Sequence, residues 1–136
     1  MGYSERIRRV AYDTSILLLL YEGVSVFDEA AELLASEPEC VVPRQVVEEL
    51  RRLASEGPGL HRMRAARLAL QALEKRGCKV VEVEAGDADD ALLELALRDR
   101  GLIVATADNG LRRRLREKGL PNIYYRRSRH GLMLEA

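Results

Sequence analysis

Residues 8–23 read RRVAYDTSILLLLYEG, and this segment indicates the fold class of the whole chain. Residues 8–12 predict a short strand that ends at Asp13. Residues 15–21 predict a helix, which Gly23 ends. A strand that passes directly into a helix is the first half of a βαβ unit.

The rest of the chain repeats this alternation, with no linker, internal repeat or low-complexity tract. Further helices are expected at 25–36, from 43 to the break at 57–59, at 61–76, 88–100 and 109–118, and further strands at 39–42, 79–83, 102–105, 123–126 and 132–134. Such alternation implies right-handed crossovers and a mostly parallel sheet. We therefore expect an α/β fold with a single domain, residues 1–136, built as a three-layer α/β/α sandwich around a mainly parallel central sheet. Function in such sheets sits beyond the carboxyl ends of the strands.

The composition bounds the function. Hydrophobic residues make up 47% and charged residues 32% of the 136 residues, which is typical of a globular protein. Lys and Arg number 22, as do Asp and Glu, so the formal net charge is zero. No global field draws the protein towards nucleic acid, and any such attraction must come from local patches.

The sequence also predicts where the protein works. The charged start, residues 1–9, has no signal-peptide apolar segment, and the longest apolar run, residues 16–21, is far shorter than the ~20 residues of a membrane span. We expect a cytoplasmic protein with no membrane partner. Cys40 and Cys78 have no metal-ligand spacing, and we expect two reduced, mostly buried thiols.

Four acidic residues fall where a parallel sheet would bring them together. Asp13 follows the first expected strand and Asp108 follows the fourth. Glu49 lies about two turns into the helix after the second strand, and Asp90 lies in the first turn of the helix after the third. We expect all four to converge on one crevice. Taken singly, each acid could instead be a surface charge or an acid that favours a helix N-terminus.

An all-carboxylate cluster implies a particular chemistry. Neighbouring carboxylates resist ionisation, and a divalent cation relieves their repulsion. Oxygen ligands without His or Cys favour Mg²⁺ or Mn²⁺ over Zn²⁺. Such an ion lowers the pKa of a bound water and neutralises charge on a phosphodiester. The cluster therefore predicts metal-assisted phosphodiester hydrolysis in which hydroxide attacks phosphorus directly.

Four segments resemble the four acidic motifs of the PIN-domain family. They are residues 10–15 (VAYDTS), 41–50 (VVPRQVVEEL), 88–96 (ADDALLELA) and 104–108 (VATAD). The tail, residues 111–125, is similar to the Fcf1-like branch of that family. By this match Glu49 is the expected ligand in the second motif, and Asp90 is best placed in the third, with Asp87 or Asp89 as alternatives.

The resemblance implies a magnesium- or manganese-dependent endoribonuclease, often dimeric. Some family members are toxins paired with an antitoxin, and others process ribosomal RNA, which makes an antitoxin or a ribosome-assembly partner the expected protein partners. The sequence departs from the family at Gly110, where many members carry a further Asp or Asn; Asn109 is adjacent but out of register. This departure supports the alternative that the chain is a catalytically weak or inactive binding module for RNA or protein.

Further residues are expected to support the site or bind the substrate. Thr14, Ser15 and Thr106 would orient the carboxylates or a phosphate, or serve only as capping residues. Single-stranded RNA is the expected partner, and its phosphates would contact Arg44, Arg51, Arg52, Arg64, Arg112 and Arg113. These arginines are equally explained as solvated helix faces paired with glutamates. Because aromatic residues make up only 4% of the sequence and Trp is absent, we expect little base readout.

A third reading is a phosphatase or phosphotransfer receiver that uses Asp13 as the nucleophile. That reading calls for a second aspartate two positions later, and residue 15 is a serine.

Overall fold

The computed structural model describes residues 7–136; the first six residues, part of the charged start, lie outside the described residues. Strands and helices alternate along the chain much as the sequence predicts. In order they are β1 (Arg9–Tyr12), α1 (Thr14–Leu17), the 3₁₀ helix η2 (Leu18–Glu22), α2 (Val26–Leu34), β2 (Glu39–Pro43), α3 (Arg44–Glu56), α4 (Leu60–Lys75), β3 (Lys79–Val81), α5 (Ala88–Arg98), β4 (Leu102–Thr106), α6 (Asn109–Glu117), β5 (Asn122–Arg126), the 3₁₀ helix η3 (Arg127–Arg129) and β6 (Gly131–Glu135).

The strands form one six-stranded sheet in the order β3-β2-β1-β4-β5-β6. Every neighbouring pair is parallel except β5 and β6, which form an antiparallel hairpin closed by η3. The expected α/β class and mainly parallel sheet are confirmed. The strand order reverses direction at the β1–β4 pair, and such switch points are where open α/β sheets bind ligands.

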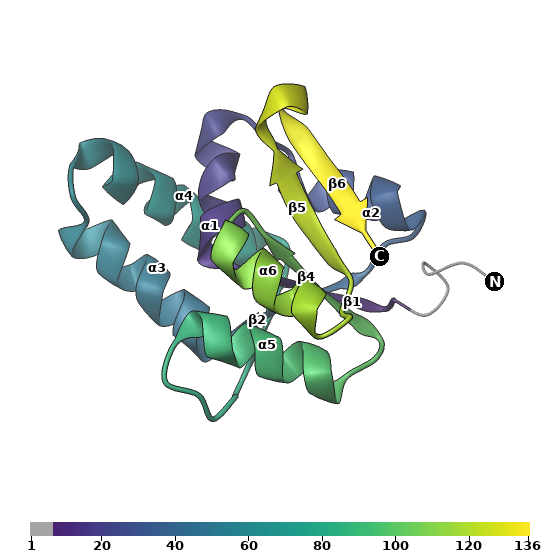
Figure 1. The fold of residues 1–136 in the computed structure, drawn as a ribbon. Coiled ribbons are helices and arrows are strands. Elements are labelled where there is room, and N and C mark those ends of the chain that lie inside the picture. Colours follow the sequence, from purple (N-terminus) through teal and green to yellow (C-terminus); the bar gives the residue numbers. More distant parts are fainter. Residues whose placement is uncertain (1–6) are drawn as a thin grey trace.

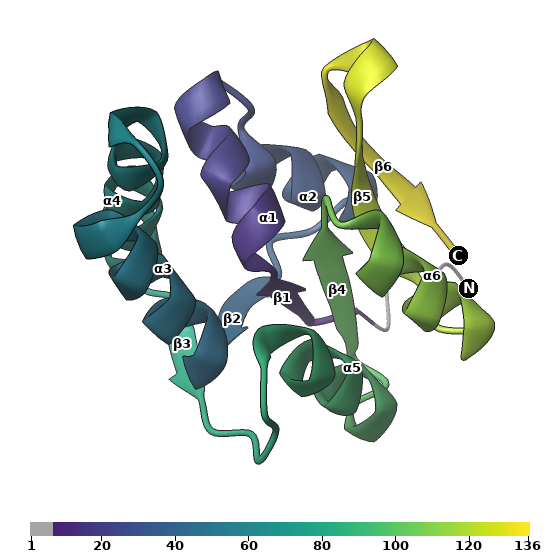
Figure 2. The same cartoon turned by 60° about the vertical axis from the view of Figure 1, so that its left-hand side comes forward.

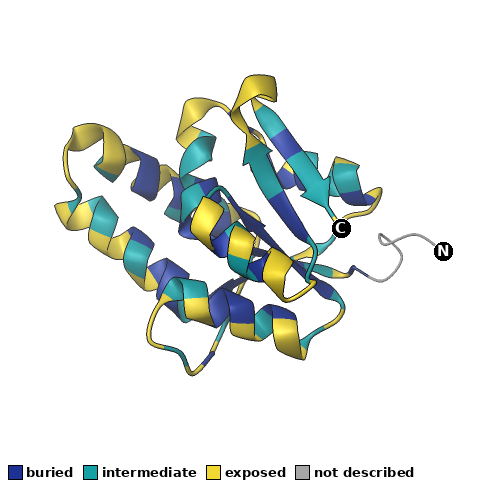
Figure 3. Ribbon diagram, viewed as in Figure 1, coloured by how far each residue is buried: buried dark blue, intermediate teal, exposed yellow. Residues whose placement is uncertain are grey.

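Helices cover both faces of this sheet. In Figure 1, α5 and α6 lie in front of the sheet and α2 lies behind it. The two central strands are buried on both faces: Val10, Ala11 and Ile103 have no exposed surface, and β4 is buried along its whole length. Figure 3 shows the buried residues gathered on the sheet and on the inner sides of the helices. Continuous apolar strands of this kind are typical of parallel sheets.

Local sequence accounts for the element boundaries. Gly23 adopts a left-handed conformation (φ 87°) and ends η2, and Gly59 (φ 98°) turns the chain from α3 into α4. The expected strand at 79–83 is shorter than predicted and stops at Val81. The reason lies in Gln45, whose amide donates to the carbonyls of Val83 and Ala85 at 2.7 and 3.0 Å, so this segment bonds to a side chain rather than to a strand.

The expectation of two reduced thiols is wrong, because Cys40 and Cys78 form a disulfide with their Cα atoms 4.7 Å apart. The register of the sheet explains the pairing. Val41 lies opposite Lys79 in the parallel β2–β3 pair, so the residues just before them lie side by side. A spacing of 38 residues hides this proximity until the strands are paired.

Within residues 7–136, the structure contains no helix that combines the length and the apolar character required to cross a bilayer.

Candidate metal centre

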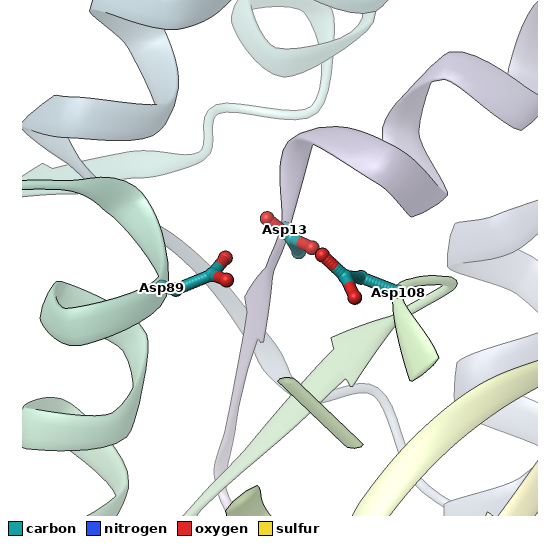
Figure 4. Close-up of side chains that lie close together, drawn as sticks. All are labelled: Asp13, Asp89 and Asp108. Carbon is teal, nitrogen blue, oxygen red and sulfur yellow. The ribbon is translucent and has the colours of Figure 1, made fainter. Parts of the chain in front are cut away.

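Three aspartates meet at the carboxyl edge of the sheet. Asp13 follows β1, Asp108 lies two residues after β4, and Asp89 lies in the first turn of α5. One carboxylate oxygen from each lies within 4.8 Å of the others. Figure 4 shows the three side chains pointing toward one another from these separate elements. Asp13 is buried, with 4% of its surface exposed, and Asp108 is the most open of the three.

The fold brings these aspartates together for a simple reason. Strands β1 and β4 pair in parallel up to Tyr12 and Ala105, so the residues that follow them leave the sheet at the same edge. Asp13 caps the N-terminus of α1 by accepting from the Thr14 amide, and Asp108 caps α6 by accepting from the Gly110 amide. Helix N-termini carry partial positive charge, which offsets part of the repulsion among the carboxylates.

The Asp13 carboxylate is held on both oxygens. Its Oδ1 accepts from the Thr14 amide at 2.8 Å, and its Oδ2 accepts from the Ser15 and Thr106 hydroxyls at 2.8 and 2.7 Å. The two hydroxyls in turn accept from the amides of Ala107 and Asp108. Because each hydroxyl has one proton and gives it to Asp13, the 3.3 Å contact between them is a close approach, not a further strong bond. Ser15 and Thr106 therefore fix the orientation of Asp13.

Glu49 reaches the edge of the cluster from α3. Its Oε1 accepts from the Thr14 hydroxyl at 2.5 Å, and its charge contributes to the raised pKa of Asp13. It is not among the three carboxylates that lie within 4.8 Å of one another. The structure thus brings Glu49 next to Asp13, with Thr14 between the two carboxylates.

The structure places Asp89, and not Asp90, in the cluster. Asp90 is exposed, and its carboxylate pairs with Arg114 at 2.8 Å. The cause is helical geometry: Asp89 shares a face with the buried residues Leu92, Leu93 and Ala96 of α5, whereas Asp90 shares a face with exposed positions. That apolar stripe is present in the sequence and is the signal that identifies Asp89.

Two other residues of this region have supporting positions. Asp87 caps α5 by accepting from the Asp90 amide at 2.8 Å, so it sets where the helix begins. Gln45 was not anticipated from the sequence. Its side chain is buried and holds the segment that leads to Asp87 through the two carbonyl contacts described above, while its Oε1 has no partner among the described residues.

The environment opposes full ionisation of the cluster. Burial raises the pKa of Asp13 above its usual range, although the hydrogen bonds from Thr106, Ser15 and Thr14 lower it. Burial, followed by the charges of Asp13, Asp108 and Asp87, raises the pKa of Asp89 to about 6, although Arg114 acts in the opposite direction. Within residues 7–136, no Lys, Arg or His forms an ion pair with Asp13, Asp89 or Asp108.

These residues fit a divalent cation. Three carboxylate oxygens from three elements converge, they lack a basic partner, and their repulsion is what a bound cation would relieve. The donor set is all oxygen, which suits Mg²⁺ or Mn²⁺. Gly110 also has a structural explanation, because a Cβ at this position would lie 3.1 Å from Asp108 Oδ1. Asn109, the neighbouring residue, is exposed at the start of α6.

The arginines expected to bind RNA divide into two groups. Arg44 pairs with Glu48 and Glu82, and Arg112 pairs with Glu135 while lying 3.5 Å over the ring of Tyr124. The other four are exposed and form no ion pair within the described part of the chain: Arg51, Arg52, Arg64 and Arg113.

Comparison with known proteins assigns the family. A family model described as a PIN-like domain matches residues 10–128, which is most of the chain. The chain belongs to the PIN-like domain family. Ribonuclease VapC4 of Methanocaldococcus jannaschii is 30% identical to this PIN-like domain over 125 residues, covering 90% of this chain and 93% of that protein. The solved structure of the PIN domain endonuclease Utp24 superposes with a TM-score of 0.75 at 22% identity, covering 93% of this chain and 90% of that one, and so shares its fold.

Proposed function

We propose that this PIN-like domain is an endoribonuclease that requires a divalent metal ion, Mg²⁺ or Mn²⁺, and hydrolyses RNA phosphodiester bonds. The observation that carries the proposal is the cluster of Asp13, Asp89 and Asp108, whose carboxylates converge without a basic partner among residues 7–136. The repulsion among these carboxylates costs stability, and removing one acid would stabilise the protein. Because the cluster lies at the switch point of the sheet, where ligands bind, we attribute this cost to function.

Each residue has a distinct role in this proposal. Asp13, Asp89 and Asp108 would hold the ion, and Ser15 and Thr106 fix the orientation of the Asp13 carboxylate. When bound, the ion would lower the pKa of a water and neutralise charge on the phosphodiester. Glu49, fixed at the edge of the cluster by Thr14, orients the attacking water and accepts its proton.

The names of the relatives support the reaction class. The M. jannaschii protein is named a ribonuclease, and Utp24 is described as a PIN domain endonuclease. The phosphotransfer hypothesis calls for a second aspartate where this chain has Ser15, and Ser15 instead donates to Asp13 at 2.8 Å.

The test is cleavage of a labelled single-stranded RNA by the purified chain with Mn²⁺ or Mg²⁺. We expect EDTA to abolish cleavage, and Asp89→Asn to reduce it far more than Asp90→Asn, which changes the neighbouring carboxylate but not the cluster. Equal rates for these two variants, or cleavage that persists in EDTA, would contradict the proposal.

A catalytically weak or inactive binding module is the second candidate, and Gly110 is the observation that favours it. Many family members resemble one another in carrying a further Asp or Asn where this chain has Gly110, so this site is expected to have one polar ligand fewer, and a Cβ here would lie 3.1 Å from Asp108 Oδ1. The candidate predicts RNA binding with no cleavage at any Mn²⁺ concentration. Calorimetry during a Mn²⁺ titration measures ion binding, and RNA cleavage at the same Mn²⁺ concentrations separates the two functions.

We propose that the chain forms a homodimer and works with either an antitoxin or a ribosome-assembly factor in the cytoplasm. The mass of the purified protein in solution tests the dimer, and affinity capture from its source cells identifies the other partner.

A further inference from the structure

A hollow of about 360 Å³ opens beside the acid cluster, between η2, α4 and the turn that joins β5 to β6. Ser15 lines this hollow and also donates to Asp13 at 2.8 Å. The hollow therefore begins at a side chain in direct contact with the cluster. Figure 2 shows the helical segment that continues α1 rising between α4 on one side and the β5–β6 hairpin on the other.

The hollow combines apolar and aromatic surface. Leu18 and Leu19, both half-buried, contribute the apolar part from η2. Tyr125 and His130 line it from the β5–β6 turn, with their rings edge to face at 6.1 Å and the tyrosine hydroxyl 3.0 Å from the histidine Nδ1. Flat apolar and aromatic surfaces are what an unpaired nucleobase stacks against.

The arginine and glutamate side chains that line the hollow are Arg62, Arg127 and Glu22, so positive charge is in excess there. Arg62 and Arg127 both line it, both are exposed, and neither forms an ion pair within residues 7–136. Glu22, which also lines it, is engaged by His61 at 2.7 Å. Two guanidinium groups without a carboxylate partner among the described residues, in a hollow that begins at Ser15, can bind phosphates of a strand that reaches the cluster.

We infer that this hollow takes one unpaired nucleotide of a single-stranded RNA, adjacent to the phosphodiester that meets the acid cluster. The base packs against Leu18, Leu19 and Tyr125, and the flanking phosphates contact Arg62 and Arg127. This inference rests on the nuclease function proposed above and specifies its substrate. A volume of about 360 Å³ lies at the lower end of the range of small-molecule pockets, which suits a single nucleotide better than a base-paired segment.

The inference changes which arginines are expected to contact RNA phosphates. Arg44 and Arg112, predicted from the sequence to contact phosphates, are already paired with glutamates. It also adds a base-stacking contact to the expected phosphate contacts, since Tyr125 lines the hollow next to the cluster, and the expectation of little base readout is unchanged because stacking tolerates any base. The rival occupant is a peptide segment of a protein partner, which would need apolar contacts but not the two arginines.

The experiment measures binding of a fluorescein-labelled six-nucleotide oligouridylate to the whole chain by anisotropy, in EDTA so that no cleavage occurs. We expect Arg62→Ala and Arg127→Ala each to weaken binding about fivefold to tenfold and to reduce the salt dependence by about 0.7 in log–log slope. Tyr125→Ala should weaken binding about tenfold, and Tyr125→Phe, which keeps the ring, should not.

The matched controls are Arg67→Ala on α4 and Arg129→Ala in η3, exposed arginines of the same elements that do not line the hollow. An equal loss of RNA affinity in all four arginine variants would overturn the inference, as would equally tight binding of a duplex of the same length. RNA binding that is unchanged in every hollow variant would also overturn the inference. If these variants behave as expected but no metal ion ever supports cleavage, the proposed function fails and the binding site stands. Metal-dependent cleavage combined with equal binding by all variants would support the proposed function and overturn the binding site.

Discussion

Strands β1 and β4 lie side by side, and the charged side chains at their amino ends differ from those at their carboxyl ends. At the amino end, Arg9 donates to Asp99 through two nitrogens, at 2.7 and 3.1 Å. At the carboxyl end, Asp13 and Asp108 face each other and Asp89, with no ion pair within the described residues. The same two strands therefore have an ion pair of opposite charges at one end and a group of negative charges at the other.

The acid groups respond accordingly. The hydrogen bond from Arg9 lowers the pKa of Asp99, whereas burial raises the pKa of Asp13 and of Asp89. The amino end gains stability from its charges, and the carboxyl end loses stability to them in the metal-free protein. We infer that the carboxyl end is arranged for a ligand that is not part of the polypeptide, and the variants described below test this contrast.

The largest effect is expected from Asp13→Asn. The amide removes one negative oxygen from the cluster but keeps the size of the side chain, so cleavage should fall about 10²- to 10³-fold, equivalent to about 3–4 kcal/mol of transition-state stabilisation. Initial rates of RNA cleavage in Mn²⁺ measure it. Asp99→Asn, at the other end of the same strands, is the control and should cleave within about twofold of the wild type. Comparable losses in both variants would remove the contrast.

Reduction of the Cys40–Cys78 disulfide should have the next largest effect. The bond closes a segment of 38 residues near the amino ends of β2 and β3, so its loss should lower the free energy of unfolding by about 2–4 kcal/mol. Thermal unfolding with and without reductant measures the change, and cleavage at 25 °C should persist. A variant with both cysteines replaced by serine should show no response to reductant; a wild type that ignores reductant would refute the prediction.

These two predictions also mark what the sequence can reveal. Asp13 and Asp108 were predictable because each follows an apolar run that could only be a strand, and parallel strands end at one edge. Cys40 and Cys78 were not, because their pairing depends on which strands become neighbours and in what register. Asp89 and Asp90 differ by a rotation of about 100° on a helix, so a motif match alone could not tell which of them enters the site. The apolar residues on the same face as Asp89 could have identified it. The hollow beside η2 depends on three segments whose packing has no local signal.

Asp99→Asn should have a smaller effect, on stability alone. Arg9 and Asp99 are about one-third exposed, so solvent weakens their attraction, and we expect a loss of about 1 kcal/mol, or roughly 3–5 °C in the melting temperature. Differential scanning calorimetry measures it. Arg76, whose pair with Asp28 is exposed, offers a comparison in which Asp28→Asn should change the melting temperature less. An Asp99 variant as stable as the wild type would show that the amino end is not stabilised by its charges.

An effect of similar size and opposite sign is expected from Asp89→Asn in the metal-free protein. Because the pKa of Asp89 is raised to about 6 in the folded chain, the folded state binds more protons than the unfolded state between about pH 4 and pH 6. Stability should therefore fall as the pH rises through this window, and the variant should lose that dependence and gain about 1 kcal/mol at pH 7, a figure already reduced for solvent screening. Urea unfolding at pH 4.5 and 7 in EDTA measures both effects.

A bound metal ion should make the wild type more stable than the Asp89→Asn variant, the reverse of the order expected in EDTA. Protons compete with the ion for Asp89, so Mn²⁺ affinity should rise as the pH rises through about 6, and Mn²⁺ should stabilise the wild type but not the variant. A variant that is less stable than the wild type in EDTA would mean that Asp89 is held by contacts that stabilise it.

The Cys40–Cys78 cross-link has a further consequence for the two helices between its ends. Both α3 and α4 lie inside the closed segment, and the Gly57–Gly59 turn joins them at the surface. A protease that cuts this turn would leave two fragments still covalently joined, which migrate as one band on a non-reducing gel and as two after reduction. The turn is accordingly a place to insert a reporter peptide, because the helices on either side stay tethered even if the backbone between them is severed.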